Sequence, residues 1–483
     1  MKKLLSVFCT IALFGAVTFQ VVSCTQIDDE DLTETTELTF DIKVINASSP
    51  NTKVVKTDWE DGDKILVFFW KSGASSSSVA RNKYLTLSYN ESTKSWTQHN
   101  TGLTSSNLGS SGTMYAVYFP FGNVTPLKDS RWNYDTYRFF YSSGNTNPAL
   151  DNYPAFSFYM IDDKGTEGKG STYVASNTQV TGTLTMKIPE NFVYFYIDAA
   201  DGKYNENEKY RLCVEGVKPA TVLSLERGSF TKLELAEGLP MWGYKYGDGI
   251  AFAGIIDETW ASAADHKFIF FSDGDPAVTK TFHNISLTSH QSVKLKAPTS
   301  SNGWERYMTA PDYEEIAGNK WSKWFLGSTS EDDVTNLHKF RWAEIVPDKA
   351  EDDFDQLPIH DLTNDDSASG TASYAIFDPA RAILGADWRM PNRDDFNSLV
   401  SNCTLTSNTS WFTFTSGDKS IKFASSIGTS IYMWTSKKND NTYIYVREYH
   451  SGENKLSETA SGTSDSPKRQ FGNNYIRPIY IGE

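Results

Sequence analysis

Aromatic side chains near the C-terminus are the residues of this sequence that are best suited to hold a ligand. Trp434 precedes three alternating tyrosines, Tyr443, Tyr445 and Tyr449, and Arg389 stands earlier in the chain. Aromatic rings offer broad apolar faces on which sugar rings can stack, and a guanidinium pairs with carboxylates. These five residues are the candidate ligand-binding residues. Alternate residues of a strand share one face, so burial of the tyrosines in a core is the structural alternative.

Two arginines, Arg389 and Arg477, also have two interpretations. Each could grip an anionic sugar or the carboxylate of a partner. Arginines of this kind more often fork onto carboxylates inside the fold, and Asp394 or Asp395 would be suitable acceptors. We favour the structural role for both.

Metal binding and catalysis have weaker signals. The acidic stretch Glu351 to Asp366 offers clustered oxygens for Ca²⁺, but it lacks the spacing of an EF-hand, and a solvated loop is the simpler interpretation. The seven histidines are scattered, and the common hydrolase, phosphate-loop and dinucleotide motifs are absent from the sequence. Acidic residues are plentiful, and two of them could act as the paired carboxylates of a hydrolase. A hydrolase is the least favoured alternative. We expect a protein that is not an enzyme and uses no cofactor or metal.

A short helix is expected to precede Arg389. Asp378 is a suitable N-cap, Pro379 fits the first helical position, and Gly385 can end the helix in a left-handed turn. Residues 387–391 must be extended, because proline disfavours helix in the residue before it.

A second helix is expected to follow at once. Asn392 can cap it and form a capping box with Asp395, and its first turn is acidic. Its apolar positions recur at the spacing of a helix face, at Phe396, Leu399, Val400 and Cys403.

The N-terminus has the pattern of a lipoprotein signal at residues 1–23. Two lysines precede an apolar run from Leu4 to Val22, and Val21-Val22-Ser23-Cys24 resembles a lipobox. Lipidation of Cys24 would anchor the mature chain in a membrane, whereas an uncleaved membrane helix is the alternative. An acidic tether is expected at residues 24–37. Its block at 25–31 resembles the export signal of Bacteroidetes lipoproteins displayed on the outer face of the outer membrane, and a solvated tether without such a signal is the alternative. We favour surface display over a periplasmic location.

Composition excludes some partners. The chain has 483 residues, enough for about three domains, and a net charge of −15, which would repel nucleic acid. Aromatic residues make up 14% of the chain and favour strands. Beyond Cys24 only Cys213 and Cys403 remain in the mature sequence, and we expect both to be small buried apolar residues outside any disulfide framework.

Strand patterns follow one another from residue 38 onward. Residues 38–44 alternate apolar and polar side chains, as in a sheet with one wet face, and Asp61-Gly62-Asp63 predicts a turn. Further strands are expected at 65–70, 84–89 and 114–119 in a first β-sandwich at 38–176, and at 182–188, 192–197, 210–214, 267–271 and 292–295 in a second at 177–298.

A resemblance accompanies these strands. Residues Trp59-Glu60-Asp61-Gly62-Asp63-Lys64-Ile65, followed by Tyr115-Ala116-Val117-Tyr118-Phe119-Pro120, resemble the pattern of fimbrillin-like proteins of Bacteroidetes. The resemblance covers residues 38 to about 298 and implies two tandem transthyretin-like β-sandwiches. It also implies partners, because stalk subunits of that family polymerise when a strand of one subunit completes the sheet of the next. Those subunits end soon after the second sandwich, whereas this chain continues to residue 483.

The C-terminal region, residues 299–483, carries a second resemblance. After a linker at 298–303, short strands are expected at 411–414, 420–423, 431–435, 442–449 and 475–481. The ordered motifs that resemble the Fibrobacter succinogenes major paralogous domain are Trp342-Ala343-Glu344, Gly385-Ala386-Asp387-Trp388-Arg389-Met390-Pro391, Cys403, Met433-Trp434-Thr435-Ser436 and Ile476-Arg477-Pro478-Ile479. The resemblance implies an α+β, C-type-lectin-like binding module, in which Trp388, Arg389, Pro391, Arg477 and Pro478 belong to the structural motif.

The fold class expected is therefore mainly β, with two tandem sandwiches followed by the α+β module. We expect a lipid-anchored surface adhesin of fimbrial type, a tip or accessory component, that binds glycan or protein through its C-terminal domain. A glycan-capture lipoprotein of a polysaccharide uptake system is the alternative.

Overall fold

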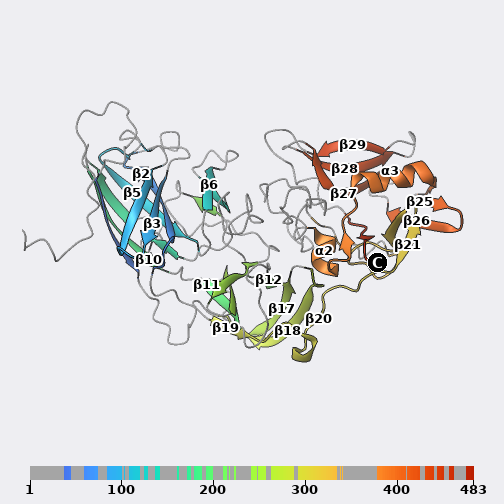
Figure 1. Cartoon of the computed structure of the whole chain (residues 1–483), viewed down its shortest axis with the longest axis horizontal. Coiled ribbons are helices and arrows are strands. Elements are labelled where there is room, and N and C mark those ends of the chain that lie inside the picture. Colours follow the sequence, from blue (N-terminus) through green and yellow to red (C-terminus); the bar gives the residue numbers. More distant parts are fainter. Residues whose placement is uncertain are drawn as a thin grey trace, which may run out of the picture. The chain divides into compact units, whose positions relative to one another are not determined.

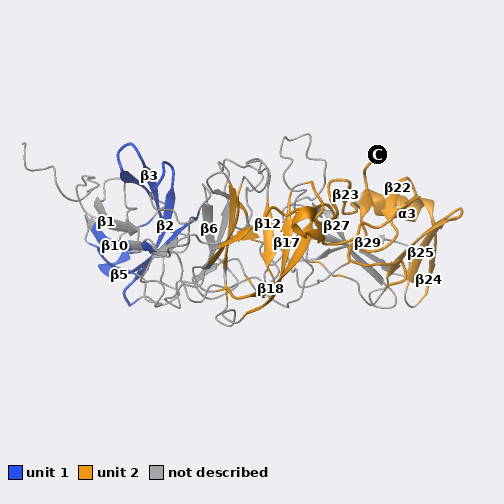
Figure 2. Cartoon of the chain, turned by 90° about the horizontal axis from the view of Figure 1, so that it is seen from below, with its two compact units in different colours: residues 1–139, 158–190, 221–234 blue, residues 140–157, 191–220, 235–483 orange. Residues whose placement is uncertain are grey.

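The structure is a computed structural model, and its described residues fall into two compact units (Figures 1 and 2). The units comprise residues 1–139, 158–190 and 221–234, and residues 140–157, 191–220 and 235–483. The described residues are 37–44, 59–73, 84–100, 103, 108–119, 124–128, 136–141, 160–162, 171–175, 179–187, 192–198, 210–214, 217, 222–224, 241–246, 249–256, 263–272, 274–287, 292–333, 338, 340, 378–408, 411–424, 430–439, 443–450, 456–461 and 475–483. The signal segment, Cys24, the acidic loop and Trp342-Ala343-Glu344 lie outside them. Among the described residues, no helix has the length and apolar run that crossing a membrane requires.

An eight-stranded sheet dominates the first unit. Its order is β1-β10-β8-β5-β2-β3-β4, and β9 pairs with both β10 and β5. The strands are β1 (Glu37–Val44), β2 (Lys64–Lys71), β3 (Leu85–Asn90), β4 (Ser95–Asn100), β5 (Ser111–Tyr118), β8 (Met160–Asp162), β9 (Ser171–Ala175) and β10 (Gln179–Lys187). A smaller sheet has the order β13-β7-β6, formed by β13 (Val222–Ser224), β7 (Thr136–Tyr141) and β6 (Val124–Lys128).

The turn predicted at Asp61 to Asp63 leads into β2 and is fixed by Asp63. One oxygen of this carboxylate accepts a hydrogen bond from the N–H of Glu60 at 2.7 Å, and the other accepts from the hydroxyl of Tyr118 at 2.8 Å. The ring of Trp59 packs edge-on against Trp96 at 5.0 Å and against Tyr118 at 5.3 Å. The residues that carry the first resemblance are therefore neighbours in space.

One strand lies in a different sheet from the one the sequence indicates. Residues 182–188 are expected in the second sandwich, but β10 pairs in parallel with all of β1, from Glu37 opposite Gln179 to Val44 opposite Met186. Spacing along the chain suggested the wrong neighbour, because a parallel pair joins strands that are far apart in sequence.

A β-sandwich opens the second unit. Its two sheets have the orders β15-β16-β11-β19 and β14-β12-β17-β18-β20. The strands are β11 (Phe192–Ile197), β12 (Arg211–Val214), β14 (Met241–Trp242), β15 (Tyr244–Tyr246), β16 (Gly249–Ile255), β17 (Ala264–Phe271), β18 (Val278–Ile285), β19 (Ser292–Leu295) and β20 (Glu305–Arg306). Inward residues of both sheets, among them Phe195, Phe252 and Phe268, form one buried core. Cys213 is buried, as expected.

The segment expected to be a linker belongs to this sandwich. A 3-10 turn (Ser300–Asn302) leads into Trp304, whose side chain is 3% exposed and packs edge-on against Phe282 at 6.1 Å. Then β20 pairs with β18. Composition suggested a linker because small polar residues precede Trp304, but burial of that large ring fixes the segment.

Among its described residues, the C-terminal part combines short sheets with the helices α2 and α3 (Figure 1). The sheet orders are β21-β22-β30-β23, β24-β25-β26 and β27-β28-β29. The elements are β21 (Tyr313–Ile316), β22 (Asn319–Ser322), α2 (Pro379–Leu384), β23 (Trp388–Arg389), α3 (Arg393–Asn402), β24 (Thr404–Ser407), β25 (Trp411–Ser416), β26 (Lys419–Ala424), β27 (Ser430–Asn439), β28 (Tyr443–His450), β29 (Leu456–Ser461) and β30 (Ile479–Tyr480). The mainly β fold class is thereby confirmed.

The core of this part lies between α3 and the neighbouring sheets. Phe396 and Leu399 of α3 are buried against Trp321 and Phe423, whereas Cys403 is half-buried beside them. The apolar stripe predicted for this helix is therefore its core face.

Backbone hydrogen bonds join α2 to the sandwich of the same unit. The N–H of Ala277 donates to the carbonyl of Ile383 at 3.0 Å, and the N–H of Ala386 donates to the carbonyl of Gly274 at 2.9 Å. Gly385 ends α2 with φ +103° and ψ 178° rather than in the left-handed turn expected, a backbone region that is open essentially to glycine alone.

Candidate functional site

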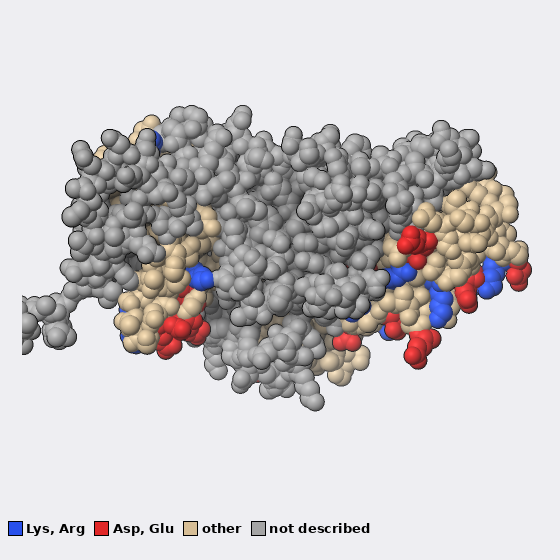
Figure 3. All heavy atoms as spheres, turned by 45° about the horizontal axis from the view of Figure 1, so that its top comes forward, with Lys and Arg blue, Asp and Glu red and all other residues tan. Residues whose placement is uncertain are grey.

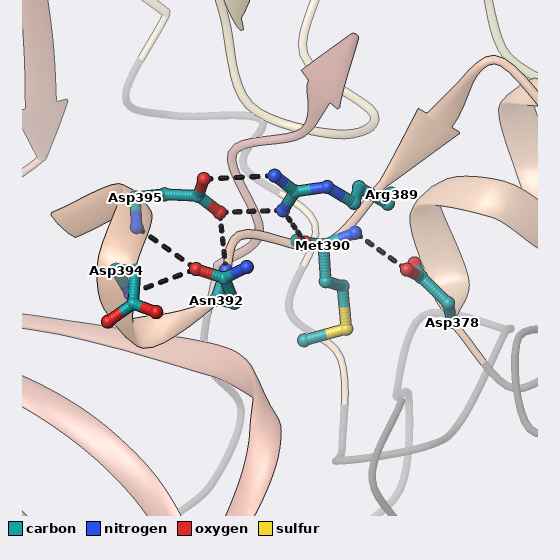
Figure 4. Close-up of polar contacts among 6 residues, drawn as sticks. All are labelled: Asp378, Arg389, Met390, Asn392, Asp394 and Asp395. Atoms are coloured by element: carbon teal, nitrogen blue, oxygen red, sulfur yellow. Dashed lines mark hydrogen bonds and ion pairs between the residues drawn. The ribbon is translucent and has the colours of Figure 1, made fainter. Parts of the chain in front are cut away.

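Asp378 joins the start of α2 to the chain that follows the helix. One carboxylate oxygen accepts hydrogen bonds from the N–H groups of Ala380 and Arg381 at 2.8 and 3.2 Å, as predicted for an N-cap. The other accepts from the N–H of Met390 at 2.7 Å (Figure 4). The side chain is fully buried, and the loss of hydration raises its pKa to about 6, although the three N–H groups favour the charged form.

The capping box predicted for α3 is present. The side-chain oxygen of Asn392 accepts from the N–H groups of Asp394 and Asp395 at 2.9 and 3.0 Å. In return, the carboxylate of Asp395 accepts from the N–H of Asn392 at 2.7 Å. Three backbone N–H groups that a helix start would leave unpaired are thereby satisfied.

Arg389, on β23, forks onto the same Asp395 carboxylate (Figure 4). Its two terminal nitrogens donate to the two oxygens at 2.6 and 2.9 Å, and one also donates to the carbonyl of Met390 at 2.9 Å. The side chains of Arg389 and Asp395 are 16% and 6% exposed. An incoming carboxylate would therefore have to displace Asp395 to gain a bidentate contact with Arg389.

Arg477 does not fork onto Asp394 or Asp395, which corrects the partners named from the sequence. Its Nε donates to the carbonyl of Ser322 at 2.8 Å, and its terminal nitrogens donate to the carbonyls of Lys323 and Lys422. Three carbonyl groups, from the end of β22, the residue after it and the middle of β26, thus share one guanidinium.

Aromatic rings and one distant acid complete the surroundings of Arg477. The centre of the guanidinium lies 5.1 Å from the ring of Phe325 and 5.3 Å from that of Phe423. A carboxylate oxygen of Glu331 is 3.9 Å away. Burial lowers the pKa of Arg477 to about 9, so the side chain stays charged at neutral pH. Because it is fully buried, Arg477 has no surface to offer a ligand.

The other residues of the structural motif are also inside. Pro391 and Pro478 are buried, and Trp388 is 5% exposed with its ring 5.2 Å from that of Tyr480. The carbonyl of Pro478 accepts from the N–H of Ser322 at 2.9 Å. These residues hold the sheet together rather than face a partner.

The aromatic candidates Trp434, Tyr443, Tyr445 and Tyr449 lie on β27 and β28. Trp434 is opposite Val446 in the register, whereas the three tyrosines occupy the alternate positions of β28. The register is irregular between Trp434 and Lys438. The three tyrosines therefore occupy positions on one face of β28, and Trp434 pairs with Val446, a position of the opposite face.

An aromatic surface that the sequence analysis did not identify lies on the outer side of the β21-β22-β30-β23 sheet. The rings of Tyr313 and Tyr480 are stacked 4.7 Å apart, and Tyr313 is 42% exposed. The ammonium group of Lys320 lies over both rings, at 5.5 and 5.2 Å, and donates to the carbonyl of Gly482 at 2.8 Å. Lys320 and Tyr480 are direct partners in the register, which only the fold shows.

Charge does not single out a partner surface in this view. The acidic and basic side chains of the C-terminal part, drawn at the right of Figure 3, are interspersed among the described residues. Within the same residues, no group of three His, Cys, Asp or Glu side chains could hold a metal ion.

Comparison with known proteins gives distant structural likenesses. No family model and no curated protein matches the sequence. A fimbrial protein from Bacteroides ovatus is 11% identical, with a TM-score of 0.23 over 92% of this chain and 99% of that one. A candidate cell adhesion protein from the same species is 13% identical, with a TM-score of 0.26 over 54% of this chain and 91% of that one. A candidate adhesin from Bacteroides thetaiotaomicron is 10% identical, with a TM-score of 0.24 over 52% of this chain and 78% of that one. Likeness at this level assigns neither a fold nor a function.

We expect Asp378 to make folding stability depend on pH. Its folded pKa of about 6 lies above the ordinary value of 3.8, so the folded state binds the proton more tightly than the unfolded chain. Stabilisation that is fully present below pH 3.8 is lost as the pH rises through about 6, a change of about 3 kcal/mol. In Asp378→Asn, the difference between the free energies of unfolding at pH 4.5 and 7.5 should shrink by about 2 kcal/mol, which is the part of this change that falls between those two pH values. Asp394→Asn, at an exposed position, is the control, and an unchanged difference in the Asp378 variant would contradict the assignment.

Replacing Arg477 by methionine should destabilise the C-terminal part by roughly 3–5 kcal/mol, because three backbone carbonyls lose their buried donor. Arg477→Met keeps the apolar stem, so packing changes little. The measurement is chemical denaturation followed by tryptophan fluorescence, with Arg306→Met on exposed β20 as the matched control. Equal stability of the two variants would show that the carbonyls find other partners.

Proposed function

We propose that this protein is a non-catalytic lipoprotein of the outer membrane, displayed at the cell surface as an accessory or tip component of a fimbria. Cys24 would carry the lipid, the acidic tether would lead away from the membrane, and the β-sandwich parts would act as spacers. The C-terminal part would contact a glycan or a protein. The lipobox and the two family resemblances of the sequence support this proposal.

The position of β1 is the observation that carries the fimbrial part of the proposal. β1 follows the tether directly and lies at one end of the sheet order, paired only with β10 among the described strands. A strand at a sheet edge can be exchanged for a strand of another chain without disturbing other pairings. β1 and β10 form eight residue pairs, so a strand of another chain could form an equally long pairing with β10. Exchange at this edge would join the protein to a neighbouring subunit.

The β27-β28-β29 sheet and its surroundings are the proposed binding surface for the glycan or protein ligand. Trp434, Tyr443, Tyr445 and Tyr449 remain the candidate contact residues, because aromatic rings supply much of the energy at binding surfaces. Arg389 is the remaining candidate, and it would act there only by giving up Asp395.

Locking β1 in place should remove the protein from fimbriae. Thr39 and Thr181 are register partners, so Thr39→Cys with Thr181→Cys offers a cross-link between β1 and β10. Full-length wild-type protein should co-purify with shed fimbriae, and the oxidised double variant should not, whereas either single variant should behave as wild type. Absence of the wild-type protein from the fimbriae of a strain that makes them would contradict the proposal. In that case, retention of polysaccharide by intact cells would favour the glycan-capture alternative.

Substituting Cys24 by serine should release the protein from membranes, because the acyl chains would have no attachment site. Fractionation of cells expressing Cys24→Ser and wild type, with Cys213→Ser as the matched control, measures this. A Cys24 variant that stays with the outer membrane would overturn the lipid anchor.

A further inference from the structure

A hollow of about 480 Å³ opens on the eight-stranded sheet of the first unit, where β2 ends and β5 begins, and β9 forms its third side. This volume is within the roughly 300–1,000 Å³ that is typical of small-molecule sites. Trp70, Thr113 and Thr172 are among its lining residues. None of the motifs discussed above lies in the hollow.

Strand register places these three side chains in one row. Trp70 is opposite Thr113 on β5, and Thr113 is opposite Thr172 on β9. Directly paired residues of antiparallel strands face the same side, about 5 Å apart. Ser111 and Val174 form the next row on that side, and Val174 is 62% exposed. The hollow therefore presents an indole ring and an open apolar side chain with hydroxyl groups between them.

The polar character of the lining is almost entirely neutral. Hydroxyl groups come from Ser72, Ser111, Thr113 and Thr172, and the one charged side chain of the lining is Lys71. Lys71 occupies the alternate position of β2, and its stem lies 3.6 Å from the place that a Cβ at Gly109 would take. The hydroxyl groups can each donate and accept hydrogen bonds, as the hydroxyl groups of a sugar do.

The backbone beneath the hollow is held in place. Tyr173 is buried, its hydroxyl donates to the carbonyl of Leu108 at 2.6 Å, and its ring packs edge-on against Phe69 at 5.2 Å. A Cβ at Gly112 would lie 2.1 Å from the carbonyl oxygen of Trp70, so no larger residue fits between these strands. A site on such a sheet needs little ordering when a ligand binds, which favours affinity.

We propose that this hollow binds a neutral sugar unit of a glycan. The ring of Trp70 would stack against the C–H face of the sugar, the four hydroxyl-bearing side chains would exchange hydrogen bonds with its hydroxyl groups, and Val174 would cover an apolar edge. A neutral sugar fits because it has an apolar face and polar edges and brings no charge that this lining would have to neutralise. This second site is separate from the recognition proposed for the C-terminal part and does not depend on it.

The test is calorimetric titration of the full-length protein with mannotriose, cellotriose and N-acetyllactosamine, and with 3′-sialyllactose as the anionic probe. At least one neutral probe should bind, and Trp70→Ala should weaken its binding by about tenfold or more. Thr172→Val removes one exposed hydroxyl at nearly constant shape, and should weaken binding severalfold with no change in the thermal unfolding midpoint. Tyr313→Ala, which removes an exposed ring of the C-terminal part, is the control and should bind as wild type.

Three results would overturn the proposal. The first is that none of the neutral probes binds the folded protein, and the second is that binding depends on the carboxylate of sialic acid. The third is binding that survives both Trp70→Ala and Thr172→Val but is lost in Tyr313→Ala, which would place the sugar on the C-terminal part. The sugar site is tested by variants of its own. If the sugar proposal fails, the proposals of fimbrial association and of a lipid anchor are therefore not affected.

Discussion

The buried guanidinium of Arg477 is the interaction on which the C-terminal part of the protein depends. Three carbonyl groups from two different segments converge on it, and two phenylalanine rings shield it from water. A buried charge is costly unless its donors are satisfied, so a packing that moves these carbonyls away from the guanidinium is disfavoured. Arg477 thus links β22 to β26 and favours the packing in which these strands lie around it.

A second polar centre fixes the chain between the two helices. Asp378 holds the N–H of Met390, while Arg389 holds Asp395 at the start of α3. The same carboxylates that cap the helices also determine where the extended segment between them runs. The capping hydrogen bonds and the tertiary hydrogen bonds therefore form one network. A substitution at the start of one helix should weaken the hydrogen bonds at the start of the other.

Local signals in the sequence predicted the elements well. The N-cap at Asp378, the capping box of Asn392 and Asp395, and the buried face of α3 depend on residues a few positions apart. The mainly β fold class followed from alternation and turn residues. The partners of Arg477 could not be predicted, because its acceptors lie 55 to 155 positions away in the sequence. For the same reason the pairing of β10 with β1, and the stacking of Tyr313 on Tyr480, appear only in the fold.

The hydrogen bonds between α2 and the loop at Gly274 to Ala277 have a mechanical consequence. They connect the C-terminal part to the sandwich of the same unit by two backbone hydrogen bonds, in addition to the covalent chain. Both bonds must break before α2 can move away from that loop. They therefore restrict the movement of α2 against the sandwich more than a flexible joint would.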